Sequence, residues 1–179
     1  LKVMEEPPEG VLFLLTADSL AGVLPTIRSR CISFAMAPVS PADCARYCTA
    51  QGVDKKDAEL YSELFDGHIG MVLAAARDEA RRAQVDKAMT LAKAAAAGDS
   101  YSAAVLLAAY EKDKAGAAAL LTDLRAVAAA GLRGVSRAPV QGETARRTLA
   151  AADAAIQRLN AQVNPKITLT VLASKFRTF

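Results

Sequence analysis

The chain has 179 residues, enough for one ordinary domain or two small ones, with 53% hydrophobic residues and a net charge of +3. This net positive charge is too small to indicate nucleic-acid binding by itself. Its three cysteines, an odd number, favour reduced thiols over a disulfide framework. No signal peptide and no apolar run long enough to span a bilayer is visible, so we expect a soluble, cytoplasmic protein without a membrane partner.

The composition favours helices. Alanine, the best helix former, supplies a large share of the hydrophobic residues. Tryptophan is absent and Phe and Tyr together number nine, so the core should be packed from Ala, Leu, Val and Ile. We therefore expect a mainly α fold, in which strands are confined to the first block of the chain.

That first block, residues 1–38, combines the end of a helix with two strand-like runs. Residues 1–6 read as a last helical turn, because the proline pair that follows cannot continue a helix. Residues 11–15 are apolar throughout, which is typical of a strand buried on both faces, and residues 32–36 predict a second strand. Two strands do not form a stable sheet alone, so we expect the chain to be part of a longer α/β protein.

The order of these features resembles the C-terminal part of the AAA+ module of sliding-clamp loaders. The family pattern runs L-K-x-L-E-E-P-P, then an apolar strand, then L-P-x-T-I-x-S-R-C. Here residues 1–8 read LKVMEEPP, residues 11–15 read VLFLL and residues 24–31 read LPTIRSRC. The resemblance implies that residues 1–38 are a two-stranded remnant of an AAA+ nucleotide-binding core.

By this resemblance, Arg30 is an arginine finger that reaches the γ-phosphate of ATP bound by a neighbouring subunit. Ser29 and Cys31 would shape its loop. A guanidinium suits the task because it stays charged and grips phosphate oxygens with a planar fork. The alternative is that Arg28 and Arg30 only decorate a surface loop.

Other nucleotide-binding elements are sparse. Thr16 falls near the place of the family's sensor-1 residue, which contacts the γ-phosphate or the attacking water. The alternative is that Thr16 is a threonine at the end of a strand without such a role. If the alignment slips by one residue, Ala17 takes this place instead. The sequence contains no G-x-x-x-x-G-K-[ST] loop and no cysteine cluster. We therefore expect no ATPase activity from this chain on its own and no cofactor beyond the neighbour's ATP, and we expect any zinc module to lie upstream.

Residues 39–78 predict three short helices that resemble the AAA+ lid domain. Ser40 is a good N-cap for a helix that ends near residue 50, Asp54 caps a second that stops near Gly67, and a third begins at His68 or Ile69. His68 reads as a helix-start residue and not as a catalytic base. Cys44 and Cys48 lie one turn apart without a second ligand pair, so we expect no zinc site and one thiol in the lid core.

The start of the third lid helix departs from the ATP-hydrolysing members of the family. They place an arginine there, the sensor-2 residue, which touches nucleotide in cis. In this chain Gly70 occupies that position, and Arg77 follows two turns later. The combination resembles a delta-prime type of subunit, which keeps the Ser-Arg-Cys finger without hydrolysing ATP itself.

Residues 79–179 predict further helices, after a charged run at residues 77–82 that we expect to be an exposed junction. The first ends at Ala97 and is closed by Gly98; others begin near residues 99 and 113 and at Glu143. Residues 131–142 read as a loop or broken helix. An apolar stripe on the third of these helices indicates a core face made of Leu120, Leu121, Leu124 and Val127.

The end of the chain, RLNAQVNPKITLTVLASKF, resembles the segment before the last helix of the clamp-loader collar. Asn164 is its expected N-cap and Pro165 its first residue, with a buried face of Ile167, Leu169, Val171 and Leu172. The resemblance implies that residues 79–179 form this oligomerisation domain. Four arginines without interleaved aromatics favour solvent or subunit contacts over DNA: Arg133, Arg137, Arg146 and Arg147.

The resulting hypothesis is a subunit of the DNA polymerase III holoenzyme, a nucleotidyltransferase complex, that helps load the sliding clamp onto primed DNA. Its implied partners are gamma/tau and delta subunits in a hetero-pentamer. One alternative is an ATP-hydrolysing gamma/tau-type subunit. Another is a stand-alone helical adaptor or regulator, and an all-helical enzyme is least favoured because no His, Asp, Glu and Cys cluster is visible.

Overall fold

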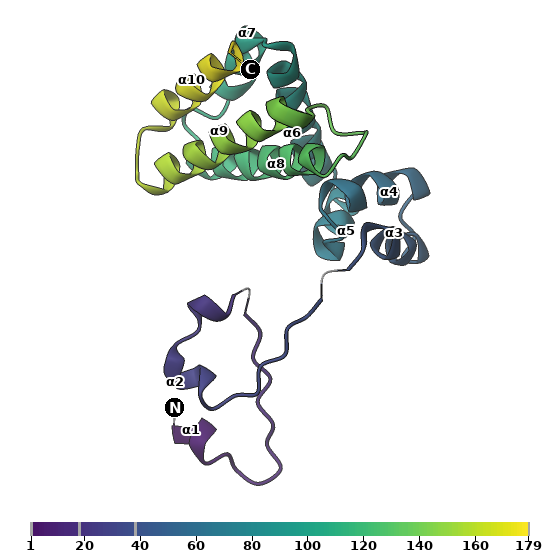
Figure 1. Ribbon diagram of the computed structural model, residues 1–179, viewed down its shortest axis with the longest axis vertical. Helices are drawn as coiled ribbons and strands as arrows, with labels where there is room; N and C mark the ends of the chain where they lie inside the picture. The colour runs from purple at the N-terminus through teal and green to yellow at the C-terminus, as the bar shows by residue number, and fades with distance from the viewer. Residues whose placement is uncertain (1, 18, 38, 179) are drawn as a thin grey trace. The chain divides into compact units, whose positions relative to one another are not determined.

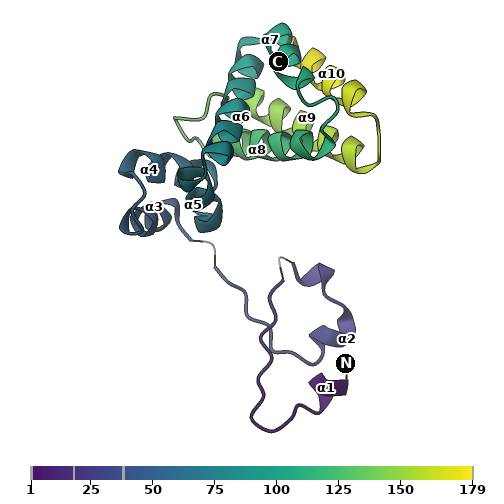
Figure 2. The ribbon, with the colours of Figure 1, turned by 180° about the vertical axis from the view of Figure 1, so that it is seen from behind.

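The computed structural model describes residues 2–17, 19–37 and 39–178. Within these residues the regular elements are all helical, which confirms the mainly α fold class. The chain divides into two compact units, Leu1–Ala37 and Pro38–Phe179. Figure 1 and Figure 2 show the helices of each unit.

The first unit holds three short helical elements. These are α1 (Lys2–Glu5), the 3-10 helix η1 (Leu20–Gly22) and α2 (Pro25–Arg28). The helical turn expected before the proline pair is confirmed by α1. Pro25 takes the first position of α2, where its fixed φ suits a helix start and its missing N–H costs nothing.

The two strands expected in this unit are not formed. Residues 11–17 and 33–37 run as irregular backbone outside any sheet ladder in the described parts of the chain. Their apolar side chains are exposed, with Leu12 81%, Leu14 85% and Phe34 83% accessible. The predicted burial on two faces is therefore wrong as well, because a strand forms and is covered only when neighbouring strands pair its backbone groups.

The second unit begins with three short helices: α3 (Pro41–Ala50), α4 (Lys55–Leu64) and α5 (Ile69–Arg77). The predicted caps are present, because Ser40 accepts a hydrogen bond from the Asp43 N–H and Asp54 accepts from the N–H groups of residues 56 and 57. Tyr61, Leu64 and Val72 are buried between these helices. Both Cys44 and Cys48 are buried, whereas one buried thiol was expected.

Five further helices complete the described part of the second unit. They are α6 (Glu79–Ala97), α7 (Ser100–Ala108), α8 (Lys114–Leu132), α9 (Gly142–Asn160) and α10 (Pro165–Phe176). The predicted stops and starts are confirmed where Gly98 ends α6 in the left-handed region and Asn164 caps α10 by accepting from the Lys166 N–H.

The helices α8 and α9 form a hairpin that makes the centre of this unit, as both views show. The apolar stripe predicted on α8 is fully buried. Helix α6 packs on α8, while α7 and α10 pack on each other and α10 also contacts α9. At the closed end of the hairpin, Gly131 allows the carbonyl of Val140 to approach so closely that a Cβ would lie 1.9 Å from that oxygen.

Two predicted burial patterns need correction. On α10, Ile167 is 59% exposed and Val171 is half-buried, while Leu169 and Leu172 are in the core as expected. In the charged run at residues 77–82, expected to be a solvated junction, Asp78 caps α6 and the Arg81 side chain turns inward. By length and composition α8 could also cross a membrane, but half of its apolar window is buried in this unit, as in a core helix.

Candidate functional site

The candidate site is the loop that follows α2 and carries Ser29, Arg30 and Cys31. The N–H of Ser29 donates to the carbonyls of Pro25 and Ile27, and the Cys31 N–H donates to the Arg28 carbonyl. A turn of helix thus leads directly into the loop. Its backbone is held by local hydrogen bonds, which need no contact from elsewhere in the chain.

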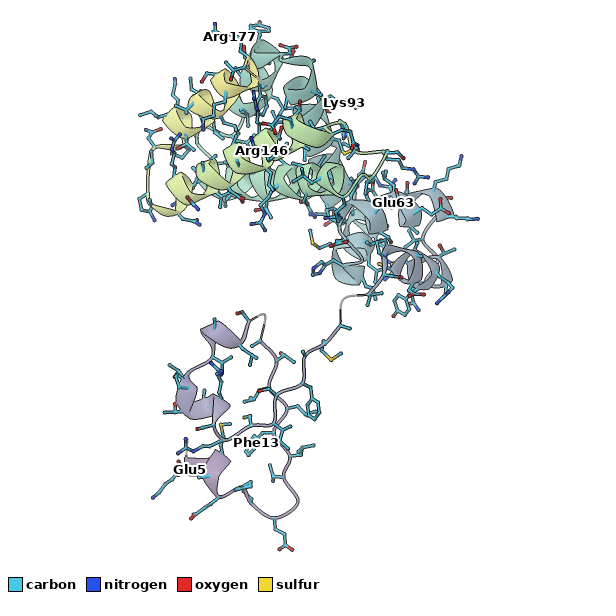
Figure 3. The ribbon with its side chains drawn as sticks, viewed as in Figure 1. Glu5, Phe13, Glu63, Lys93, Arg146 and Arg177 are labelled. Carbon is cyan, nitrogen blue, oxygen red and sulfur yellow. The ribbon has the colours of Figure 1, made fainter. Side chains whose placement is uncertain are left out.

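Arg30 lies at the centre of a small polar cluster. Its Nη1 donates to the Thr26 carbonyl at 2.7 Å and lies 3.4 Å from the Ser29 hydroxyl oxygen. Its Nη2 forms an ion pair with the carboxylate of Glu5, the residue on α1 that Figure 3 labels. The Ser29 hydroxyl donates to the same Thr26 carbonyl at 3.2 Å. Ser29 and Arg30 therefore share one acceptor in this loop, and the motif role of Ser29 stays a prediction.

Arg28, the other arginine of the loop, has a different environment. It is exposed and borders an open cavity of about 540 Å³. The other lining residues are Leu20, Pro25, Ser29 and Ser33. The two guanidinium groups, two residues apart, are thus distinguished by their partners, and only Arg30 has a carboxylate partner among the described residues.

The remaining predicted site residues have less structure around them. Cys31 is a half-buried free thiol directly after Arg30. Thr16 is exposed in the irregular segment, and no hydrogen bond joins it to the Arg30 loop in the described part of the chain. The structure brings together Ser29 and Arg30, and it leaves the sensor role of Thr16 as a prediction.

The start of α5 is where a nucleotide-contacting cation was considered. His68 is the residue before the helix and makes no side-chain capping bond. Gly70 is exposed, and a Cβ added to it would meet nothing within 4 Å. The position therefore has room for a side chain, so steric crowding does not account for the glycine there.

Sequence reasoning missed a buried ion pair between α6 and α8. Arg81 grips both carboxylate oxygens of Asp123, with Nη2 at 2.6 Å from Oδ1, and Gln84 donates to Asp123 at 2.7 Å. The hydrogen bonds that Arg81 donates to Asp123 raise the pKa of Arg81. The Arg81 guanidinium also lies 5.8 Å from the centre of the Phe65 ring. The signal was present, since Asp123 interrupts the apolar stripe of α8.

Two other arginines, both in the segment after α8, contact α4 and the turn that follows it. Arg133 donates to the carbonyls of Glu63 and Leu64 at 3.0 and 3.3 Å and pairs with Asp66. Arg137 pairs with Glu59 at 3.5 Å. Two arginines predicted to meet solvent or other subunits are thus engaged within the unit.

On α9, Arg146 and Arg147 both contact Glu143, one turn before them. Arg146 binds it with two hydrogen bonds of 2.8 and 2.6 Å. Hydrogen bonds from Arg146 and then Arg147 lower the pKa of Glu143 to about 2. One carboxylate thus offsets part of the charge of two arginines on this helix, and Figure 3 labels Arg146.

An exposed apolar surface lies on α7 and α10. Tyr101 and Val105 of α7 and Ile167 of α10 are 79%, 59% and 59% exposed. Between the two helices is a cavity of about 300 Å³, lined mainly by apolar atoms of residues such as Val105, Leu107 and Leu169. Tyr101 and Val105 both line this cavity, and exposed apolar side chains gathered in this way are typical of protein contacts.

No group of three or more His, Cys, Asp or Glu side chains suited to a metal ion occurs in the parts of the chain that the structure describes.

Comparison with known proteins adds one match. A family profile described as "DNA polymerase III, delta subunit" matches residues 1–40, the segment that contains Glu5 and the Arg30 loop. Searches of the curated proteins and of the solved structures gave no match. The match covers the segment of the candidate site and leaves residues 41–179 outside it, so it shows that this segment is similar to that family.

Proposed function

We propose that this chain is a delta-prime-type subunit of a bacterial clamp loader and offers Arg30 to ATP bound by a neighbouring subunit. The observation that carries the proposal is the Ser-Arg-Cys loop, placed directly after a helical turn within the family-matched segment. In this proposal the part that these residues take in ATP hydrolysis is made through the neighbour's nucleotide.

The chemistry follows from the guanidinium. Charge accumulates on the phosphoryl oxygens as the γ-phosphate is transferred, and a fixed cation supplied by another subunit stabilises it. Because the cation comes from a different chain, hydrolysis then depends on subunit contact. The backbone hydrogen bonds of Ser29 and Cys31 support a loop that can present such a group.

Gly70 supports the delta-prime assignment over the gamma/tau alternative. The position is exposed and has room for a long side chain, and yet it carries no cation. A subunit that needed a cis arginine at this point could accommodate one without rearranging the helix.

For assembly, we propose that residues 79–179 join the other subunits of a cytoplasmic hetero-pentamer, gamma/tau and delta. The exposed apolar surface of α7 and α10, with Tyr101, Val105 and Ile167, is the best-suited contact surface in the described part of this region. The complex, rather than this chain alone, would engage the sliding clamp and primed DNA.

The test is the ATPase activity of a reconstituted clamp loader, measured with clamp and primed DNA, for wild type and Arg30→Ala. We expect Arg30→Ala to lower stimulated turnover at least about tenfold, because loss of a trans arginine removes transition-state charge stabilisation. Arg28→Ala is the matched control and should keep wild-type turnover. Gel filtration must show that each variant still assembles.

Unchanged turnover with Arg30→Ala in an assembled complex would remove the finger from the proposal. Failure of the wild-type chain to join clamp-loader subunits at all would contradict the assignment as a whole.

A further inference from the structure

The ion pair between Glu5 and Arg30 carries an inference that rests on the proposed function and deepens it. We propose that Glu5 is the resting partner of Arg30, and that the guanidinium exchanges this carboxylate for a phosphate when a nucleotide-bearing neighbour docks. Glu5 is then a positioning residue, which acts through Arg30 and sets how tightly the loop engages the neighbour's nucleotide.

The geometry shows that the guanidinium is already engaged on two sides. Nη2 pairs with Glu5 and Nη1 donates to the Thr26 carbonyl, so both terminal nitrogens have partners within the unit. A phosphate is gripped best by two parallel N–H groups of one guanidinium. The bond from Nη1 to Thr26 is local to the α2 turn and can persist, whereas Glu5, 25 residues away in the sequence, pairs with Nη2.

Electrostatic repulsion prevents the Glu5 carboxylate and a phosphate from binding Nη2 at the same time. A carboxylate left beside an incoming phosphate would place two anions together, which costs free energy in the restricted space of a subunit interface. The Glu5 carboxylate must therefore leave as the phosphate arrives. Its presence in the resting state also offsets the positive charge by which Arg30 would attract the phosphate.

The pair is exposed enough to open. The Arg30 and Glu5 side chains are 33% and 43% accessible, and ion pairs of such exposure contribute little net stability because water and salt screen them. Glu5 is the last residue of α1, and one residue separates it from the proline pair that follows the helix. The carboxylate thus holds Arg30 in one position without holding it so tightly that exchange is blocked.

The sequence offers a matched control one residue away. Glu6 carries the same charge, but its position follows α1, and the only ion pair of Arg30 in the described residues is with Glu5. Glu5→Gln removes the competing charge and keeps the side-chain size, and Glu6→Gln removes an equal charge beside it. Glu5→Asp keeps the charge on a side chain one methylene shorter.

The experiment is steady-state ATP hydrolysis by the reconstituted clamp loader, with the apparent KM for ATP and kcat measured separately. We expect Glu5→Gln to lower the apparent KM by roughly two- to fivefold, the range that loss of a half-exposed ion pair allows, with kcat unchanged. Glu6→Gln should match wild type, and Glu5→Asp should restore most of the wild-type KM. In an Arg30→Ala background, Glu5→Gln should have no further effect.

Each other result overturns the inference. An unchanged KM with Glu5→Gln means that the carboxylate does not compete with phosphate, and a lowered kcat means that it aligns Arg30 instead. An effect that persists without Arg30 means that Glu5 acts elsewhere. If Arg30→Ala does not change ATP turnover in an assembled complex, both the proposed finger and this inference are wrong. If Arg30→Ala lowers turnover but Glu5→Gln leaves the KM unchanged, only this inference is wrong.

Discussion

The residue with the most demanding environment in this chain is Asp123, a carboxylate 1% exposed on the apolar face of α8. A buried charge is tolerated only when it is paired and hydrogen-bonded. Arg81 and Gln84 supply both, from α6. The cluster therefore fixes the relation between α6 and α8 and, through the Phe65 ring beside Arg81, the end of α4.

Asp123→Ala should destabilise the protein by about 3 kcal/mol, because it leaves the guanidinium of Arg81 mostly buried without its partner. The exposed pair of Arg125 and Asp153, at 3.6 Å, provides the control. Asp153→Ala should change the free energy of unfolding by less than about 1 kcal/mol. Urea unfolding followed by circular dichroism measures both, and equal losses would contradict the role given to burial.

The buried thiol of Cys48 predicts an alkaline dependence of stability. Burial, and next the neighbouring Cys44, raise the pKa of Cys48 from 9.0 to about 11. The unfolded thiol thus loses its proton at lower pH than the folded one, so the stability contribution is complete below pH 9 and is lost as the pH rises toward 11. Burial raises the pKa of Tyr61 as well, in the same direction.

Thermal unfolding between pH 8 and pH 11 tests this point. We expect Tm to fall across the range, and to fall less in Cys48→Val, which cannot ionise. Tyr61→Phe should remove only the part of the fall in Tm that comes from ionisation of Tyr61. A Tm that fell equally in wild type and Cys48→Val would show that the thiol is not responsible.

At the scale of the elements, two helical glycines should respond to alanine with opposite signs. In α8, a Cβ on Gly131 would lie 1.9 Å from the Val140 carbonyl oxygen and 3.0 Å from its carbon, so backbone would have to move. We expect Gly131→Ala to cost about 1–3 kcal/mol. In α5, Gly70 faces open space, and Gly70→Ala should stabilise by up to about 1 kcal/mol through helix propensity.

Chemical denaturation of the two single variants separates the two effects. A destabilised Gly70→Ala would mean that the glycine at the start of α5 has a structural task beyond what its open surroundings show. A neutral Gly131→Ala would mean that the α8–α9 hairpin yields easily at its closed end.

The same scale shows what the sequence could predict. The helices from α3 to α10 were predictable because their limits are local: Ser40, Asp54 and Asn164 are caps, and Gly98 is a stop. The strands at residues 11–15 and 32–36 were predicted wrongly, because a ladder depends on a partner strand that local patterning does not supply.

Side-chain partners were harder to predict than elements. Arg81 contacts Asp123, 42 positions away, and Arg133 contacts Leu64, 69 positions away. The pattern of charges along one helix does not predict contacts between residues so far apart in the sequence. Ser29 and Arg30 were singled out by their resemblance to a family motif, and both contact the Thr26 carbonyl within the α2 turn. Glu5 was not singled out, since its contact with Arg30 spans 25 residues.

At the scale of the whole molecule, every buried hydrophobic side chain in the described residues lies between Cys44 and Phe176. The core of the unit Pro38–Phe179 is therefore complete without the first unit. We expect a chain of residues 38–179 to unfold cooperatively with a Tm within a few degrees of the full chain. Calorimetry of the two chains measures this, and a large drop would reveal that the first unit contributes to stability.

The exposed run of residues 11–15, Val-Leu-Phe-Leu-Leu, also sets how this protein must be handled. Five consecutive exposed, apolar and uncharged residues outside any helix are a template for intermolecular stacking into fibrils. Pro7, Pro8 and Glu9 stand just before the run, where a missing N–H and a charge interrupt such stacking. Replacing these gatekeepers would leave the folded helical unit unchanged and convert a soluble preparation into one that aggregates with time and concentration.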